Sequence, residues 1–340
     1  MELPLLRLGL LGFDRASASL ATARILAATQ PFARWDIVPF EDADLWLIHS
    51  PSVSLNDNHG LRIRNADTPD APLTIYPQQS SRPLAFTQPL PAKVDAPLSV
   101  ALNDAYDWAQ SLNAFNDILN KLCCHFALGE QVASRQSGLV DNTYHLHFEG
   151  RLVAMVDLAH WQAGLLPSAR PKDLALASWR HRPNEAQTFP QGFEVLSLER
   201  LMWVYASRTQ NPVLPAAYQT SPIHLRRLSV LPQGWLHDDH MSLIGRLHQQ
   251  PCTMAMLARL TLLPFKRLNA CLAALYYSGT ITVDPRQIVQ GDKRLRSRHA
   301  EPGQPESPEH SSHSVLAVDK RPSGQSVFET HSFEPSTATA

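Results

Sequence analysis

Two groups of histidines have the residue types and spacing of metal ligands. His145 and His147 lie two positions apart in an alternating apolar stretch, so they share one face of a predicted strand. Asp157 or His160 is the candidate third ligand. Residues 237–240 place two histidines around two aspartates, but those aspartates also suit a helix start and would leave the histidines in solvent. Neither group completes a tetrahedral site, so the sequence predicts no bound metal.

The other residue patterns exclude the common cofactor and nucleophile sites. The chain has no glycine-rich phosphate loop, no GxSxG elbow and no HExxH motif. Its four cysteines have neither disulfide nor zinc spacing. No apolar run reaches membrane-spanning length, and the first residues lack the basic region of a signal peptide. We therefore expect a cytoplasmic protein without cofactor, membrane contact or enzymatic activity.

Basic side chains in the last third of the chain suggest a different chemistry, which is contact with nucleic acid. Arginine, lysine and asparagine hydrogen-bond to base edges and phosphates. The whole chain has a formal net charge of −1, so any positive surface must be local. An ordinary solvated face followed by a basic run at 293–298 is the alternative interpretation. The candidate DNA-binding residues are Lys266, Arg267, Asn269, Arg259 and Arg286.

These basic residues fall in a stretch whose pattern predicts three helices and a hairpin. Asp238 and Asp239 suit the cap of a helix that opens at Met241, and further helices fit residues 253–260 and 264–277. Strands at 280–283 and 288–289 would flank a turn. This order resembles a winged helix-turn-helix domain over about 50 of the 340 residues. The resemblance implies a third helix in the major groove and a wing on the backbone, or a surface that packs on protein.

Short apolar strands alternate with helices in the first third of the chain. Such alternation predicts an α/β domain with a parallel sheet covered by helices. Helices are expected at 16–29 and 98–112. The expected strands are 5–13, 35–40, 44–49, 73–76 and 84–87.

The same order resembles the receiver domain of bacterial response regulators, over roughly residues 5–112. A receiver's acidic pair is reduced here to Asp14 beside Arg15, and His49 stands where the third strand would end in the phosphate acceptor. A single carboxylate cannot supply the oxygen ligands that Mg²⁺ requires. The resemblance therefore implies a degenerate receiver without phosphotransfer, which serves as a docking or dimerisation platform. His49 as a replacement acceptor is the alternative.

Between these two regions the sequence predicts a small α+β module. A hairpin over 144–157 would turn at Glu149-Gly150, a helix would run over 197–207 with Ser197 as its cap, and a strand would cover 223–228. From about residue 291 the composition predicts disorder, with 314–318 as a short binding segment. The predicted domains are 1–112 (degenerate receiver-like), 113–235 (α+β module), 236–290 (winged helix) and 291–340 (disordered tail).

Together these features predict a non-catalytic bacterial signalling or transcriptional regulator, in which a degenerate receiver is coupled to a winged-helix output on DNA. A protein–protein adaptor that uses the winged helix as its docking surface is the first alternative. A metal-dependent enzyme that uses the middle histidines is the second. A continuous positive strip over the third helix would favour DNA, and an apolar patch would favour a protein partner.

Overall fold

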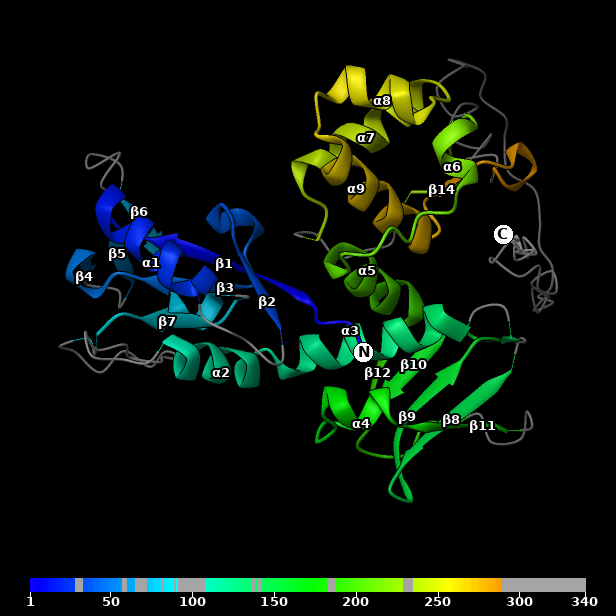
Figure 1. The fold of residues 1–340 in the computed structure, drawn as a ribbon, viewed down its shortest axis with the longest axis horizontal. Coiled ribbons are helices and arrows are strands. Elements are labelled where there is room, and N and C mark those ends of the chain that lie inside the picture. Colours follow the sequence, from blue (N-terminus) through cyan, green and yellow to red (C-terminus); the bar gives the residue numbers. More distant parts are fainter. Residues whose placement is uncertain are drawn as a thin grey trace, which may run out of the picture.

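The structure of the protein is a computed structural model, which describes residues 1–27, 33–56, 60–64, 72–80, 82–88, 90, 108–135, 138–139, 142–182, 188–228 and 235–288. A parallel sheet, an antiparallel sheet and a group of helices follow one another along the chain (Figure 1). None of the helices in these residues is long and apolar enough to cross a membrane. The predicted tail from 291, the basic run at 293–298 and positions 98–107 of the expected helix lie outside the described residues.

The parallel sheet near the N-terminus confirms the expected α/β architecture. Its strand order is β2-β1-β3-β7, and every pairing is parallel. Leu6 and Leu8 of the first strand are fully buried, because helices α1 and α2 cover the face to which they point. The elements are β1 (Leu5–Leu11), α1 (Arg15–Ala27), β2 (Arg34–Ile37), β3 (Leu45–Ile48), β7 (Leu84–Phe86) and α2 (Trp108–Ile118). We call this unit the N-terminal sheet.

One strand expected in this parallel sheet belongs to another sheet. Leu73–Ile75 (β6) pairs antiparallel with Leu61–Ile63 (β5), which pairs antiparallel with Val53–Leu55 (β4). Parallel neighbours need a crossover of a dozen or more residues, usually a helix, whereas antiparallel neighbours need only a short turn. The chain between β3 and β7 has no α-helix among its described residues, only two single-turn 3₁₀ helices, so these short strands pair with each other.

The middle of the chain forms a five-stranded antiparallel sheet of order β11-β8-β9-β10-β12. The predicted hairpin is confirmed: Glu149 and Gly150 both have positive φ at the turn, the backbone that a tight two-residue hairpin requires. The predicted cap is also confirmed, because the Ser197 hydroxyl accepts from the Arg200 N–H at 3.3 Å. The elements are α3 (Asn120–Arg135), β8 (Thr143–Phe148), β9 (Arg151–Asp157), β10 (Gln162–Leu165), α4 (Pro171–Ala175), β11 (Ser178–Arg182), β12 (Glu194–Ser197) and α5 (Leu198–Arg208).

The last third holds the three helices that the sequence predicts. These C-terminal helices are α7 (Asp238–Gln249), α8 (Met254–Thr261) and α9 (Phe265–Tyr277), preceded by α6 (Ala217–Thr220). Helix α7 begins three residues earlier than expected, so Asp238 and Asp239 lie in its first turn instead of capping it. Carboxylates are favourable there, because they interact with the positive end of the helix dipole.

The expected hairpin after α9 is not what the described residues form. Ile281–Thr282 (β14) pairs antiparallel with His224–Leu225 (β13), a strand that precedes α7. The segment expected to be the turn forms a 3₁₀ helix over Pro285–Gln287. Of the expected returning strand, Ile288 is in no strand and Val289 lies outside the described residues. Pro285 lacks a backbone N–H donor and has a fixed φ, so this segment forms a local turn. The edge of β14 pairs with β13 instead.

Candidate functional site

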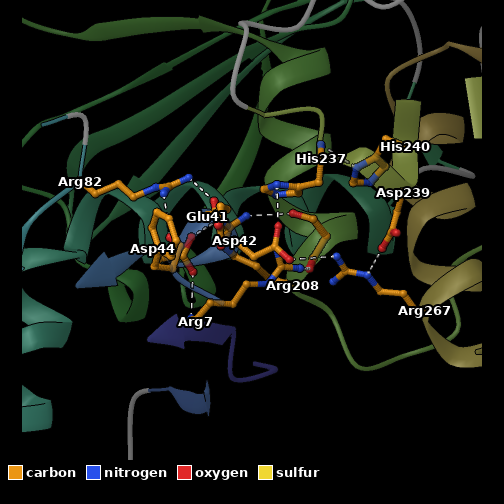
Figure 2. Close-up of polar contacts among 12 residues, drawn as sticks. Arg7, Glu41, Asp42, Asp44, Arg82, Arg208, His237, Asp239, His240 and Arg267 are labelled. Atoms are coloured by element: carbon orange, nitrogen blue, oxygen red, sulfur yellow. Dashed lines mark hydrogen bonds and ion pairs between the residues drawn. The ribbon is translucent and has the colours of Figure 1, made fainter. Parts of the chain in front are cut away.

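The structure places the five candidate DNA-binding residues in two different environments. Arg259 on α8, Lys266 on α9 and Arg286 after β14 are exposed. Asn269 is half-buried on α9. Arg267 is also half-buried, and its guanidinium points into the protein interior between the C-terminal helices and the N-terminal sheet (Figure 2). Three of the five are thus accessible to a macromolecular ligand, and Arg267 already has acidic partners.

Beyond the first turn of α7, the C-terminal helices contain basic residues and no acidic ones. From His240 to Val283 the chain contains no aspartate or glutamate. The same stretch contains Arg246, Arg259, Lys266 and Arg267. A local excess of this kind attracts polyanions, although the chain as a whole is close to neutral.

Exposed apolar side chains lie close in sequence to the exposed Arg259 and Lys266, at the turn between α8 and α9. Leu262 is 87% exposed and Phe265 is 67% exposed. Met256 and Leu260 on α8 are partly exposed as well. Leu262 has a positive φ of 57°, a conformation that leucine rarely adopts, so the turn holds this side chain outward against a backbone cost. The surface over α8 and α9 is therefore basic and apolar together.

Arg267 binds two carboxylates from opposite sides of the interior. Its Nε lies 2.8 Å from Asp239 Oδ2 on α7, and its Nη2 lies 3.4 Å from Asp42 Oδ2 in the N-terminal sheet. Asp42 ends a 3₁₀ helix, Phe40–Asp42, that connects β2 to β3. Its second oxygen, Oδ1, lies 2.8 Å from His237 Nδ1 just before α7. One carboxylate of the N-terminal sheet therefore binds two residues of the C-terminal helices (Figure 2).

A second polar layer lies beneath Asp42 and joins the N-terminal sheet to α5. Arg208, at the end of α5, forms an ion pair with Asp44 in which both side chains are almost buried. The Asp44 Oδ2 also accepts from the backbone N–H of Arg7 at 3.0 Å. The Arg7 guanidinium reaches across and donates to the carbonyl of Ser207 at 2.9 Å. These bonds tie β1 and β3 to the last turn of α5.

A cavity of about 310 Å³ opens among these groups. Arg82 extends over it from the loop before β7 and donates to the carbonyls of Phe40, at 2.9 Å, and Glu41. We call this region the junction. Its members are Arg7, Asp42, Asp44, Arg82, Trp203, Arg208, Trp235, His237, Asp239, His240 and Arg267.

The sequence suggested that the histidines of the junction lie in solvent, but the structure buries His240 and half-buries His237. His240 is only 5% exposed, because its ring packs on Trp203 with a centroid distance of 4.7 Å. Burial lowers the pKa of His240 to about 3, so this ring is neutral at pH 7. Burial also lowers the pKa of His237, although the carboxylate of Asp42 opposes that shift. The expectation was wrong because the sequence cannot reveal that Trp203 covers this helix start.

The histidine group around His145 and His147 also forms contacts with protein side chains. The Nε–H of Arg182 points to His145 Nδ1 at 3.2 Å. Asp157 is buried and lies 2.8 Å from His160 Nδ1. The described residues contain no group of three or more His, Cys, Asp or Glu side chains arranged to hold a metal ion.

Asp14 and His49, the two residues weighed above for phosphate chemistry, have local structural contacts. Asp14 accepts from the Ser17 N–H at 2.7 Å, and this bond lowers the pKa of the Asp14 carboxyl. His49 at the end of β3 lies with Nδ1 3.2 Å from the Ser52 hydroxyl, and its ring contacts Phe13. These contacts shape the start of α1 and the turn after β3.

Sequence reasoning missed most of the junction. Arg7 is a charged residue inside an apolar strand, and Asp42 and Asp44 both lie just before β3. A charge within a buried strand was the one available signal, because buried arginines need partners. Comparison with models of known families, with curated proteins and with solved structures finds no match for this chain.

Proposed function

We propose that this protein is a non-catalytic regulator whose C-terminal helices bind DNA and whose N-terminal sheet restrains that output. The observation that carries the proposal is the pairing of Arg267 with Asp42, which joins a candidate DNA-binding residue to the N-terminal sheet. Arg259 and Lys266 supply exposed positive charge on the same helices. Because no acidic residue occurs from 240 to 283, nothing in that stretch repels a phosphate backbone.

The N-terminal sheet fits a regulatory role through its position. It resembles a receiver that lacks the phosphate acceptor, and Asp42 lies in the connection between its second and third strands. A change in that connection would release or hold both Arg267 and His237. The input is therefore expected to be binding at the N-terminal sheet or at the junction, without phosphotransfer.

The test is a fluorescence anisotropy titration with duplex fragments from the region of the protein's own gene, at two salt concentrations. Lys266→Ala and Arg259→Ala should each weaken binding and each reduce the salt slope by about 0.9, because each lost phosphate contact releases about one counterion fewer. Lys172→Ala removes a lysine on α4 that is also exposed, and it should leave both quantities unchanged. Affinities no tighter than about 10⁻⁴ M for every fragment would contradict the proposal.

A protein partner is the second candidate, and the exposure of Leu262 and Phe265 favours it. Exposed apolar residues with cations on the same helices suit an acidic protein segment with its own apolar side chains, because both the apolar surface and the charge would then be matched. On this alternative, Lys266→Ala leaves the weak DNA association unchanged. Phe265→Ala would instead weaken binding of an acidic amphipathic peptide, which a neutral peptide of the same apolar pattern controls.

A further inference from the structure

The junction cavity is large enough for a small organic molecule. Its volume of about 310 Å³ lies at the lower end of the range for ligand sites, which is about 300–1,000 Å³, whereas one water occupies about 30 Å³. The N-terminal sheet, helix α5 and the segment before α7 all contribute to its wall. Ligand sites occur preferentially where such units meet.

The wall of this cavity contains more hydrogen-bond donors than its own carboxylates use. Each of Arg7, Arg82 and Arg208 has five N–H donors on its guanidinium. Arg7 uses one of these in a hydrogen bond, to Ser207, and Arg82 and Arg208 use two each. The Nε of Arg208 is buried and has no partner among the described residues. A buried donor without an acceptor is costly, so this wall is suited to an added oxyanion.

The acidic residues of the wall are already engaged. Asp44 accepts from Arg208 and from the Arg7 backbone, and Asp42 is bound by His237 and Arg267. The three arginines outnumber these two aspartates, and His240 adds no charge at pH 7. Burial and the neighbouring Arg208 lower the pKa of Arg7, although Asp44 and Asp42 oppose that shift.

Two tryptophans give the cavity an apolar side. Trp203 is buried and Trp235 is half-buried, and both line the cavity. The guanidinium of Arg200 lies 4.9 Å from the centre of the Trp235 ring. A single inorganic oxyanion would not contact the parts of these indoles that line the cavity, whereas a ligand with a flat ring would pack on them.

We propose that the junction cavity binds a small organic phosphate that carries a flat ring, with Arg7, Arg82 and Arg208 holding the oxyanion. Guanidinium groups suit this role because their planar donors bind phosphate oxygens in pairs. The site goes beyond the proposed DNA contact and does not depend on it. Its position beside Asp42 also places the ligand next to the pair that holds Arg267.

Isothermal titration calorimetry on the full chain tests the proposal, with adenosine 5′-monophosphate, adenosine and inorganic phosphate as separate probes. The nucleotide should bind saturably at one site per chain, and adenosine and inorganic phosphate should each bind at least about tenfold more weakly, a difference of about 1.4 kcal/mol. Equal affinity for nucleotide and inorganic phosphate would overturn the ring requirement. Absence of any saturable binding of nucleotide or phosphate would overturn the site.

Variants locate the binding. Arg82→Met removes a half-buried charge that forms no ion pair among the described residues, so the fold should tolerate it and the nucleotide affinity should fall at least about tenfold. The Arg7→Met variant, once circular dichroism has shown that it folds, should lose nucleotide affinity to the same extent. Arg24→Met removes an exposed charge on α1, away from the cavity, and should leave binding unchanged. Nucleotide binding that survives Arg82→Met at full affinity would contradict the assignment.

Discussion

At the scale of single residues, the junction shows how burial changes what a side chain contributes. Arg267 was expected to face DNA and instead binds Asp42 and Asp239. His240 was expected in solvent and instead packs on Trp203. In both cases the sequence did not reveal the partners of the side chain, because these partners come from elements far away in the sequence.

Two buried histidines should make the protein less stable in mild acid. Burial lowers the pKa of His125 to about 4 and of His240 to about 3, from an ordinary value of 6.5. The folded state therefore keeps both rings neutral while the unfolded chain binds protons below pH 6.5. Stability is complete above that pH and falls as the pH drops toward the folded pKa values, by about 1.4 kcal/mol per pH unit for each ring.

Urea unfolding at pH 7.5 and pH 5.5 measures this effect. His240→Phe keeps an aromatic ring against Trp203 and removes the proton site, so the loss of stability between the two pH values should shrink. His248→Gln changes an exposed histidine on the same helix and serves as the control. An unchanged loss in both His240→Phe and His125→Phe would show that these rings do not titrate as described.

At the scale of elements, helix α5 holds the molecule together because its two faces belong to two cores. Leu201 and Tyr205 pack in the core of the middle sheet. Trp203 and Ala206 pack in the core of the C-terminal helices. Figure 1 shows α5 between α3 and α9, as its packing requires. Helix α5 therefore packs on both the middle sheet and the C-terminal helices.

The close approach of α3 to α5 depends on Gly129. A Cβ at this position would lie 2.7 Å from the Tyr205 Cβ, closer than packed carbons allow. Gly245 on α7 is also helical, but a Cβ there would meet nothing within 4 Å. We expect Gly245→Ala to stabilise the protein by about 0.5–1 kcal/mol, because alanine favours the helix. The Gly129→Ala variant should be about 1–3 kcal/mol less stable than the Gly245→Ala variant, because overpacking against Tyr205 opposes the gain in helix propensity.

Chemical denaturation of the two glycine variants makes this comparison directly, with the same substitution at both positions. Equal stabilisation of both variants would mean that α3 and α5 are not in close contact at Gly129.

At the scale of the whole molecule, the N-terminal sheet and the C-terminal helices are joined by polar contacts at the junction. Asp42 and Arg267 are separated by 225 positions in the sequence and are within ion-pair distance in the fold. Glu2 adds another link, since its carboxylate accepts from Thr209 and Asn211 after α5. Regulation in this scheme is a change in these long-range polar contacts.

Asp42→Asn should weaken the hold on Arg267 and His237. Partly exposed ion pairs contribute up to about 1 kcal/mol, so a release of this size should tighten DNA binding up to about fivefold. Hydrogen exchange in the first turns of α7 and α9 should also become faster. Glu41→Gln removes the same charge from the neighbouring residue, whose exposed side chain does not contact Arg267, and should change neither quantity.

The hydrogen-exchange result separates the two parts of this idea. Faster exchange in Asp42→Asn without tighter DNA binding would support the proposal that Asp42 restrains the C-terminal helices. It would contradict the proposal that this restraint controls DNA binding. Identical exchange in the Asp42→Asn variant, the Glu41→Gln variant and the wild type would contradict the restraint itself.

The sequence by itself determined the elements that local physics specifies. The hairpin turn at Glu149-Gly150, the Ser197 cap of α5 and the helices α8 and α9 all follow from period, capping and turn residues within a few positions. The alternation of strands and helices likewise predicted a parallel sheet near the N-terminus.

Only the tertiary structure decided which distant segments meet. The pairing of β14 with β13, the antiparallel pairing of β6 and the binding of Arg267 by Asp42 each join segments that local patterns do not connect. The local sequence of a strand edge or a charged side chain does not specify its partner. Strand edges and charged side chains pair with whatever the packed cores bring within a few ångströms, and that choice depends on the burial of the whole chain.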